Sequence, residues 1–120
     1  MRRRLASGFA AAALACGGFG AALAQDNVDE VAQGHHIATL VCSPCHVAAK
    51  DQAFEPILRP PAPAFEALAQ RSAVNEAFLH KFLATTHRDI SNPQGMPNPQ
   101  LLDDQVQQVS AYLLSLRKKP

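Results

Sequence analysis

The stretch Cys42-Ser43-Pro44-Cys45-His46 carries the most specific chemistry of the chain, because two thiols two residues apart are followed at once by an imidazole. Three kinds of site share such a cysteine pair. A disulfide across so short a loop would constrain little of the unfolded chain. A thioredoxin-like redox pair needs β-strands around the motif, and the flanking sequence offers none. A zinc site needs two more ligands, and His80 and His87 are not spaced as a matching pair.

The histidine directly after the second cysteine favours a fourth site. Two thiols at this spacing attach haem through thioether bonds to its vinyl groups, and the next imidazole then reaches the iron. We therefore expect one covalent haem c bound by Cys42 and Cys45, with His46 as an axial ligand of the iron.

The N-terminus has the three parts of a secretory signal peptide: three arginines after Met1, an uncharged apolar run, and the small-x-small end Ala22-Leu23-Ala24. We expect residues 1–24 to be the signal peptide and residues 25–120 the mature domain, which places the protein in the periplasm. Haem attachment after export agrees with this location. An uncleaved membrane anchor is the alternative, since the apolar run is near the length of a short spanning helix. Cys16 also allows a lipoprotein signal.

The mature chain is small and almost neutral. Removing 24 of the 120 residues leaves 96, and the loss of three arginines leaves 8 basic against 10 acidic residues, a formal charge of −2. A domain of this size buries only a modest core, to which a large apolar cofactor would add. No basic stripe indicates nucleic acid. The cluster Arg117-Lys118-Lys119 is interpreted as favourable charge at a helix C-terminus.

Met96 is the expected second axial ligand. It is the only methionine of the mature chain, and it lies in a Pro- and Gly-rich stretch, residues 91–99, that fits neither helix nor strand. Prolines on both sides stiffen this loop, and a methionine opposite histidine raises the reduction potential of haem iron. The alternative is a surface methionine in a turn. Competing ligands are the remaining histidines, of which His87 is the strongest rival to Met96, ahead of three others: His35, His36 and His80.

Hydrophobic periodicity predicts an all-α domain of about four helices around the haem. The helices are expected over Val28–Val41, Asn75–Thr86 and Asp103–Leu116, with a shorter one over Ala64–Gln70. Asp103 is the expected N-cap of the last helix. Residues 56–63 and 90–99 are expected to be loops.

Gly34-His35-His36-Ile37-Ala38 ahead of the motif, and residues 109–116 at the end of the chain, resemble the N- and C-terminal helices of small class I mono-haem bacterial c-type cytochromes. The resemblance covers residues 28–117. It implies that the two helices cross at Gly34 against Tyr112 or Leu113. It also implies a proline carbonyl that accepts the proximal histidine N–H, for which Pro63 is the candidate and Pro61 the alternative.

A covalently held iron with two protein ligands has no open position for a substrate. We therefore expect a one-electron carrier working by outer-sphere transfer, not an enzyme, with periplasmic redox proteins as donor and acceptor, and no membrane span after cleavage. The expected oligomeric state is a monomer or a subunit of a complex. The alternatives are a dedicated cytochrome subunit of a periplasmic dehydrogenase, and an enzyme or gas sensor in which the methionine dissociates. Arg59, Arg71 and His87 are candidates for propionate contacts.

Overall fold

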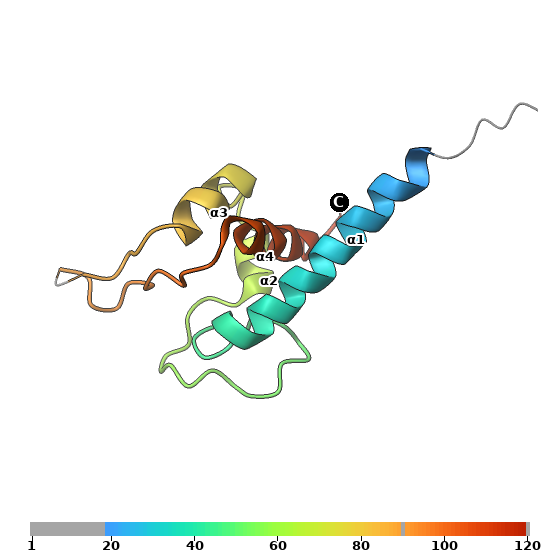
Figure 1. Cartoon of the computed structure of the whole chain (residues 1–120). Coiled ribbons are helices and arrows are strands. Elements are labelled where there is room, and N and C mark those ends of the chain that lie inside the picture. The colour runs from blue at the N-terminus through green and yellow to red at the C-terminus, as the bar shows by residue number, and fades with distance from the viewer. Residues whose placement is uncertain (1–18, 90, 120) are drawn as a thin grey trace, which may run out of the picture.

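Two helices that cross at a glycine organise the fold (Figure 1). Helix α1 spans Phe19–Ile37 and helix α4 spans Asp103–Ser115. A Cβ atom on Gly34 would lie 1.9 Å from the carbonyl oxygen of Gln108 and 2.8 Å from the Cβ of Tyr112. Only glycine permits this approach, and the crossing expected at Gly34 and Tyr112 is confirmed.

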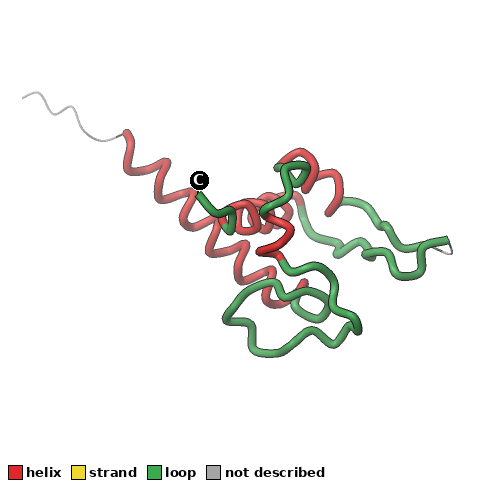
Figure 2. Tube along the Cα trace, turned by 180° about the vertical axis from the view of Figure 1, so that it is seen from behind, coloured by secondary structure: helices red, strands yellow, loops and turns green. Residues whose placement is uncertain are grey.

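The computed structural model describes residues 19–89 and 91–119, with side chains from residue 26 onward. Within these ranges the regular structure is entirely helical, as predicted for an all-α domain (Figure 2). A π-helical turn, Ala38–Cys42, continues α1, and the short helices α2 and α3 span Phe65–Ala69 and Glu76–Leu83. Residues 1–18 of the expected signal peptide lie outside the described residues. Among the described helices, none combines the length and apolar character that crossing a membrane requires.

The first helix differs from its predicted range at both ends. It begins before Val28, at Phe19, and its regular α-helical part ends at Ile37. The π-helical turn that follows is closed by the backbone N–H of Ser43, which donates to the carbonyl of Ala38 at 3.2 Å. The Ser43 hydroxyl also donates to the Thr39 carbonyl at 2.6 Å. The sequence predicts that the helix ends at Val41, whereas the π-helical turn reaches Cys42. The motif therefore follows the helical chain without an intervening loop.

The helices α3 and α4 are shorter than predicted, for local reasons. Asn75 caps α3 by accepting the Phe78 N–H at 2.9 Å, so the helix begins one residue later than expected. It ends at Leu83 because the Thr85 hydroxyl turns back to a helix carbonyl, a competition typical of threonine. The prediction of Asp103 as N-cap of α4 was wrong: Leu102 is the extended cap residue, and the Gln105 side chain accepts its N–H at 3.0 Å.

The core lies where α4 packs against α1, α2 and α3. The Tyr112 hydroxyl donates to the Ala48 carbonyl at 3.1 Å, which ties α4 to the chain just after the motif. Arg117 reaches the carbonyls of Ala69 (2.9 Å) and Val74 and so caps the end of α2, a more specific role than the expected charge at a helix C-terminus. The buried apolar residues are Ala38, Cys42, Ala48, Ala49, Phe65, Ala69, Val74, Leu79, Leu83, Val106, Val109, Tyr112 and Leu113.

Candidate haem site

The paired cysteines lie in a tight turn at the end of the π-helical segment. The N–H groups of Cys45 and His46 both donate to the Cys42 carbonyl, at 3.1 and 2.9 Å. Both thiols are free, with Cys42 buried and Cys45 half-buried. Burial raises the pKa of Cys42 to about 11, and the nearby Cys45 adds to the increase. The turn therefore brings the two cysteines close together, and their thiols are not joined to each other.

The chain returns alongside the motif and fixes its conformation. The carbonyl of Pro44 accepts the Ile57 N–H at 2.9 Å, and the carbonyl of Cys45 accepts the Ala62 N–H at 2.9 Å. His46 and Ala62 form an isolated parallel bridge. This segment, residues 44–64, is the motif loop, and it extends below the helices in Figure 1.

The His46 ring is held in one orientation by a backbone carbonyl. Its Nδ1 donates to the carbonyl oxygen of Pro63 at 2.7 Å, and a carbonyl can only accept, so the proton resides on Nδ1. No hydrogen bond engages Nε2 in the described structure. The His46 ring forms a T-shaped contact with the ring of Phe65, with centroids 5.5 Å apart. Of the two candidate prolines, Pro63 rather than Pro61 makes the bond, and Nε2 is left with a free lone pair suited to a metal.

Met96 lies on a second loop, separate from the motif loop in sequence and in Figure 1. Its carbonyl accepts the backbone N–H of His87 at 2.8 Å, which closes residues 87–96 into the Met96 hairpin. At the tip, the Asp89 carboxylate accepts hydrogen bonds from Ser91 and from the N–H of Asn92, and these bonds lower the pKa of Asp89. Met96 is half-buried and packs against the core.

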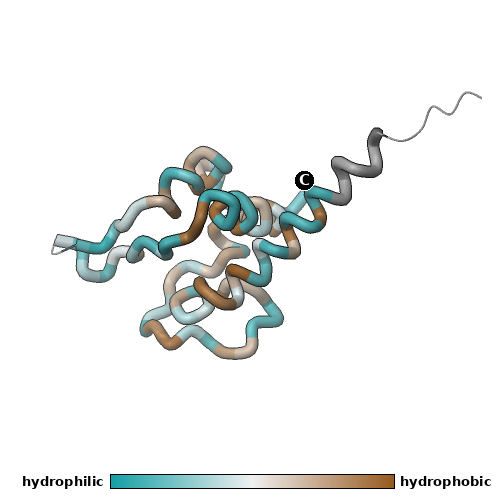
Figure 3. The backbone as a smooth tube through the Cα atoms, viewed as in Figure 1, coloured by the Kyte–Doolittle hydropathy of each residue, from teal (hydrophilic) through white to brown (hydrophobic). Residues whose placement is uncertain are grey.

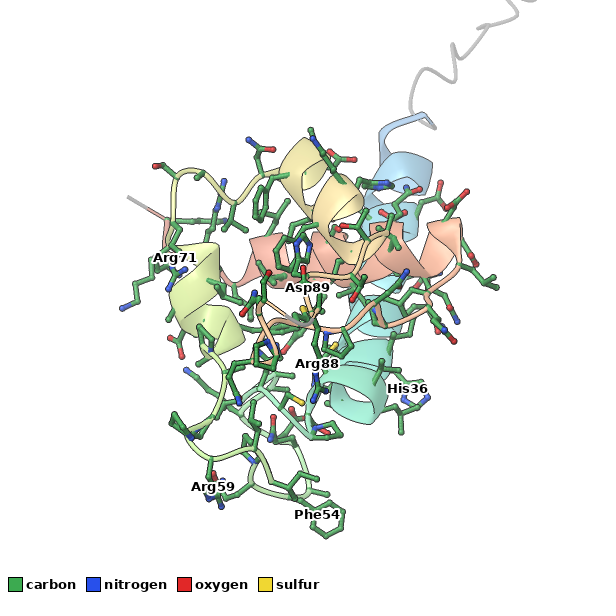
Figure 4. All side chains as sticks on the ribbon, turned by 90° about the vertical axis from the view of Figure 1, so that its left-hand side faces the viewer. His36, Phe54, Arg59, Arg71, Arg88 and Asp89 are labelled. Atoms are coloured by element: carbon green, nitrogen blue, oxygen red, sulfur yellow. The ribbon has the colours of Figure 1, made fainter. Side chains whose placement is uncertain are left out.

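The other histidines have structural partners or solvent around them. His35 Nε2 lies 2.8 Å from a carboxylate oxygen of Asp51, and the His35 ring stands edge-on to Tyr112. That hydrogen bond is the main reason that the pKa of Asp51 is lowered. His36 projects outward (Figure 4), and His80 is exposed on α3.

The remaining rival, His87, stacks on Phe82 at a centroid distance of 3.8 Å, and its Nε2 donates to the Phe82 carbonyl at 3.1 Å. It therefore follows the end of α3 as a cap, which was one of its expected roles. Among the described residues, no three His, Cys, Asp or Glu side chains gather as potential metal ligands.

Large apolar side chains are exposed on both segments that flank the motif. Phe54 and Ile57 on the motif loop are 81% and 80% exposed, and Leu40 and Val41 in the π-helical turn are 65% and 43% exposed. Figure 3 colours parts of both segments as hydrophobic. Exposed apolar area of this kind usually marks a binding site. The exposed large hydrophobic residues near the motif in sequence are Leu40, Val41, Val47, Phe54, Ile57 and Leu58. Two free thiols, a nitrogen with a free lone pair and this apolar surface together fit a covalently attached haem.

The arginines considered for propionate contacts are engaged or distant. The Arg59 guanidinium donates to the carbonyls of Pro56 and Leu58 in its own loop. Arg71 follows α2 at the end away from the motif loop (Figure 4).

Residues 31–117 match the family model described as Cytochrome c. The match includes the helix crossing, the cysteine pair, His46, Pro63 and Met96. No curated protein and no solved structure matches the chain.

Proposed function

The chain belongs to the cytochrome c family, and from this premise we propose that it is a periplasmic mono-haem electron carrier whose iron is ligated by His46 and Met96. The family match establishes electron transfer through a covalently bound haem c, and with it a role among redox partners. When bound, the haem supplies the one-electron couple of its iron. The residues that hold it, and the compartment, are what we propose.

The observation that carries the proposal is the hydrogen bond from His46 Nδ1 to the Pro63 carbonyl. It fixes the tautomer, so that Nε2 is the nitrogen available to iron, and it restrains rotation of the ring. Cys42 and Cys45 would form the thioether bonds from positions only a turn away from His46. In this arrangement the chain presents all three attachment groups from one rigid turn.

Met96 is proposed as the second ligand because it is the only methionine among residues 25–120 and the Met96 hairpin holds it near the core. A thioether opposite an imidazole raises the reduction potential. If His46 and Met96 both hold the iron, it would have no open position for a substrate, and the surrounding side chains would have none to orient. Their task is to exclude water from the cofactor while leaving one edge accessible to partners.

Partner contacts are proposed to be weak and apolar. The motif loop exposes Phe54 and Ile57, and the mature chain has a formal charge of only −2, which gives little long-range electrostatic steering. Small transient interfaces suit a carrier that must leave each partner quickly. A stable complex with a periplasmic dehydrogenase would instead appear as co-elution with that enzyme from a periplasmic extract.

Replacing Met96 tests the ligation. The exported Met96→Ala holoprotein should lose the sulfur-to-iron charge-transfer band, and its midpoint potential should fall by about 0.1 V or more, within the roughly 0.8 V range that axial ligands set. Gln94→Ala, an exposed change in the same hairpin, should alter neither quantity. If Met96→Ala keeps both the band and the potential, another residue ligates the iron. Carbon monoxide binding by the reduced wild type at neutral pH that is as tight as in a haem protein with an open iron position would favour the gas-sensor alternative.

N-terminal sequencing of the exported protein tests the proposed processing. We expect the sequence to begin at Gln25. A chain that retains residues 1–24 in the membrane fraction would establish the anchor instead, and a lipid-bearing Cys16 would establish the lipoprotein.

A further inference from the structure

Three aromatic rings form a column along the outer side of α3. The rings of Phe78 and Phe82 are stacked with centroids 5.3 Å apart and planes 22° apart, and Phe82 and His87 are stacked at 3.8 Å and 12°. The buried side of α3 is made by Leu79 and Leu83, so the column does not serve the core. Phe78 is 42% exposed. Core packing therefore does not explain this partly exposed aromatic stack. The contacts of its last ring, His87, do.

His87 is held by its ring and by its backbone at the same time. The ring donates from Nε2 to the Phe82 carbonyl, and the Thr85 hydroxyl lies 3.2 Å from the same nitrogen. The backbone N–H donates to the Met96 carbonyl at 2.8 Å. The His87 carbonyl accepts from the Asn92 side-chain amide at 2.9 Å. These bonds make His87 the junction between α3 and the Met96 hairpin.

We propose that His87 is a positioning residue for Met96. The aromatic column and the cap on α3 fix the His87 ring, and the His87 backbone transmits that position to the Met96 carbonyl. The Met96 side chain would then hold the iron from a fixed backbone position. This inference rests on the proposed His46/Met96 ligation.

The test compares holoprotein variants by signals that a purely structural residue would not move. His87→Ala removes the stack and the ring hydrogen bond, interactions that together correspond to about a tenfold change in an equilibrium. We expect the reduced His87→Ala protein to bind carbon monoxide about tenfold more tightly than the wild type does. Its sulfur-to-iron band should be lost at a lower pH and at a lower temperature than in the wild type. The midpoint potential should fall. His80→Ala removes an exposed histidine of α3 that lies outside the column, and it should match the wild type in all three measurements.

Two further variants separate the effect of losing the aromatic column from the effect of losing the fold. His87→Phe keeps a ring on Phe82 and should restore part of the ligation that His87→Ala loses. Phe82→Leu keeps an apolar side chain on α3 but removes the stacking surface, so it should weaken the ligation even if His87→Ala fails to fold. Denaturant unfolding followed by far-UV circular dichroism should show little change for either.

The outcomes distinguish the two proposals. If Met96→Ala removes the band but the His87 and Phe82 variants retain wild-type band, potential and carbon monoxide affinity, the positioning role is overturned while the ligation stands. If Met96→Ala leaves the wild-type spectrum unchanged, the ligation fails and the positioning role fails with it. A wild-type spectrum of two imidazole ligands that His87→Ala abolishes would make His87 itself the ligand and would overturn both.

Discussion

The helical frame, formed by α1, α2 and α4, and the Met96 hairpin, residues 87–96, are held together in different ways. The frame is closed by side chains far apart in sequence, with Ala38 and Val109 fully buried and Gly34 in backbone contact with Gln108. The hairpin is exposed over most of its length, and its hydrogen bonds join residues within ten positions of each other. The frame is therefore held by long-range packing, whereas the hairpin is held by short-range hydrogen bonds that anchor Met96 at its base.

The largest effect should come from breaking the frame at the helix crossing. Gly34→Val places a branched side chain where even a Cβ would lie 1.9 Å from the Gln108 carbonyl oxygen. Backbone cannot yield as a side chain can, so the free energy of unfolding should fall by about 3 kcal/mol or more, at the upper end for overpacking. Denaturant unfolding measures this. Gln33→Val puts the same residue at an exposed neighbouring position and should cost under about 1 kcal/mol. Equal stability of the two variants would contradict the crossing.

A glycine substitution in the Met96 hairpin should leave the stability of the frame nearly unchanged. A Cβ on Gly95 would lie 1.7 Å from the His87 carbonyl oxygen, so Gly95→Ala must open the hairpin. The sulfur-to-iron band should disappear, whereas the free energy of unfolding of the frame should change by less than about 1 kcal/mol. Visible absorption and far-UV circular dichroism separate the two effects. Cooperative loss of the frame in Gly95→Ala would show that the regions are not independent.

A smaller effect should come from the one buried side-chain oxygen of the described residues that has no hydrogen-bond partner. Ser110 is 1% exposed on the core side of α4, and its hydroxyl is unsatisfied. Ser110→Ala removes that desolvated group, so the free energy of unfolding should stay unchanged or rise by about 1 kcal/mol. Ser115→Ala is the control, because the Ser115 hydroxyl donates to the Tyr112 carbonyl at 2.6 Å. A greater loss in Ser110→Ala than in the control would mean that its hydroxyl has a partner in the holoprotein.

The smallest effect should be a pH dependence where α1 meets the motif loop. The hydrogen bond from His35 lowers the pKa of Asp51 below 3.8 in the folded state. A lowered folded-state pKa stabilises the fold above the unfolded pKa, and this contribution is lost as pH falls through the folded value. The Tm of Asp51→Asn should be slightly below that of the wild type at neutral pH, and the difference should vanish in acid. A difference that persists below the folded-state pKa would exclude this hydrogen bond as its cause.

The parts of the molecule predicted from sequence are those set by local pattern or by sterics. The attachment motif is contiguous in the sequence. A glycine where two helices cross, such as Gly34 against Tyr112, has a steric explanation, because the missing Cβ permits close approach. The Pro63 hydrogen bond was expected only from the resemblance to class I cytochromes c, which left Pro61 as an alternative, and the structure shows it at Pro63. The ends of the helices were missed because they depend on single side-chain bonds, such as that of Thr85. The connection from Phe82 through His87 to Met96 was missed because the backbone bond joins residues nine apart through a loop. In the sequence, this connection was indicated only by the spacing of Phe78, Phe82 and His87.

The central claim is that Cys42 and Cys45 attach one haem to a frame that the chain builds for itself. The mass of the denatured mature chain, measured on protein from the periplasm, tests this most directly. We predict the mass of residues 25–120 plus one haem, and loss of that addition when both cysteines are replaced by serine. A mass equal to the bare chain, or two hydrogens below it as for a Cys42–Cys45 disulfide, would contradict the claim.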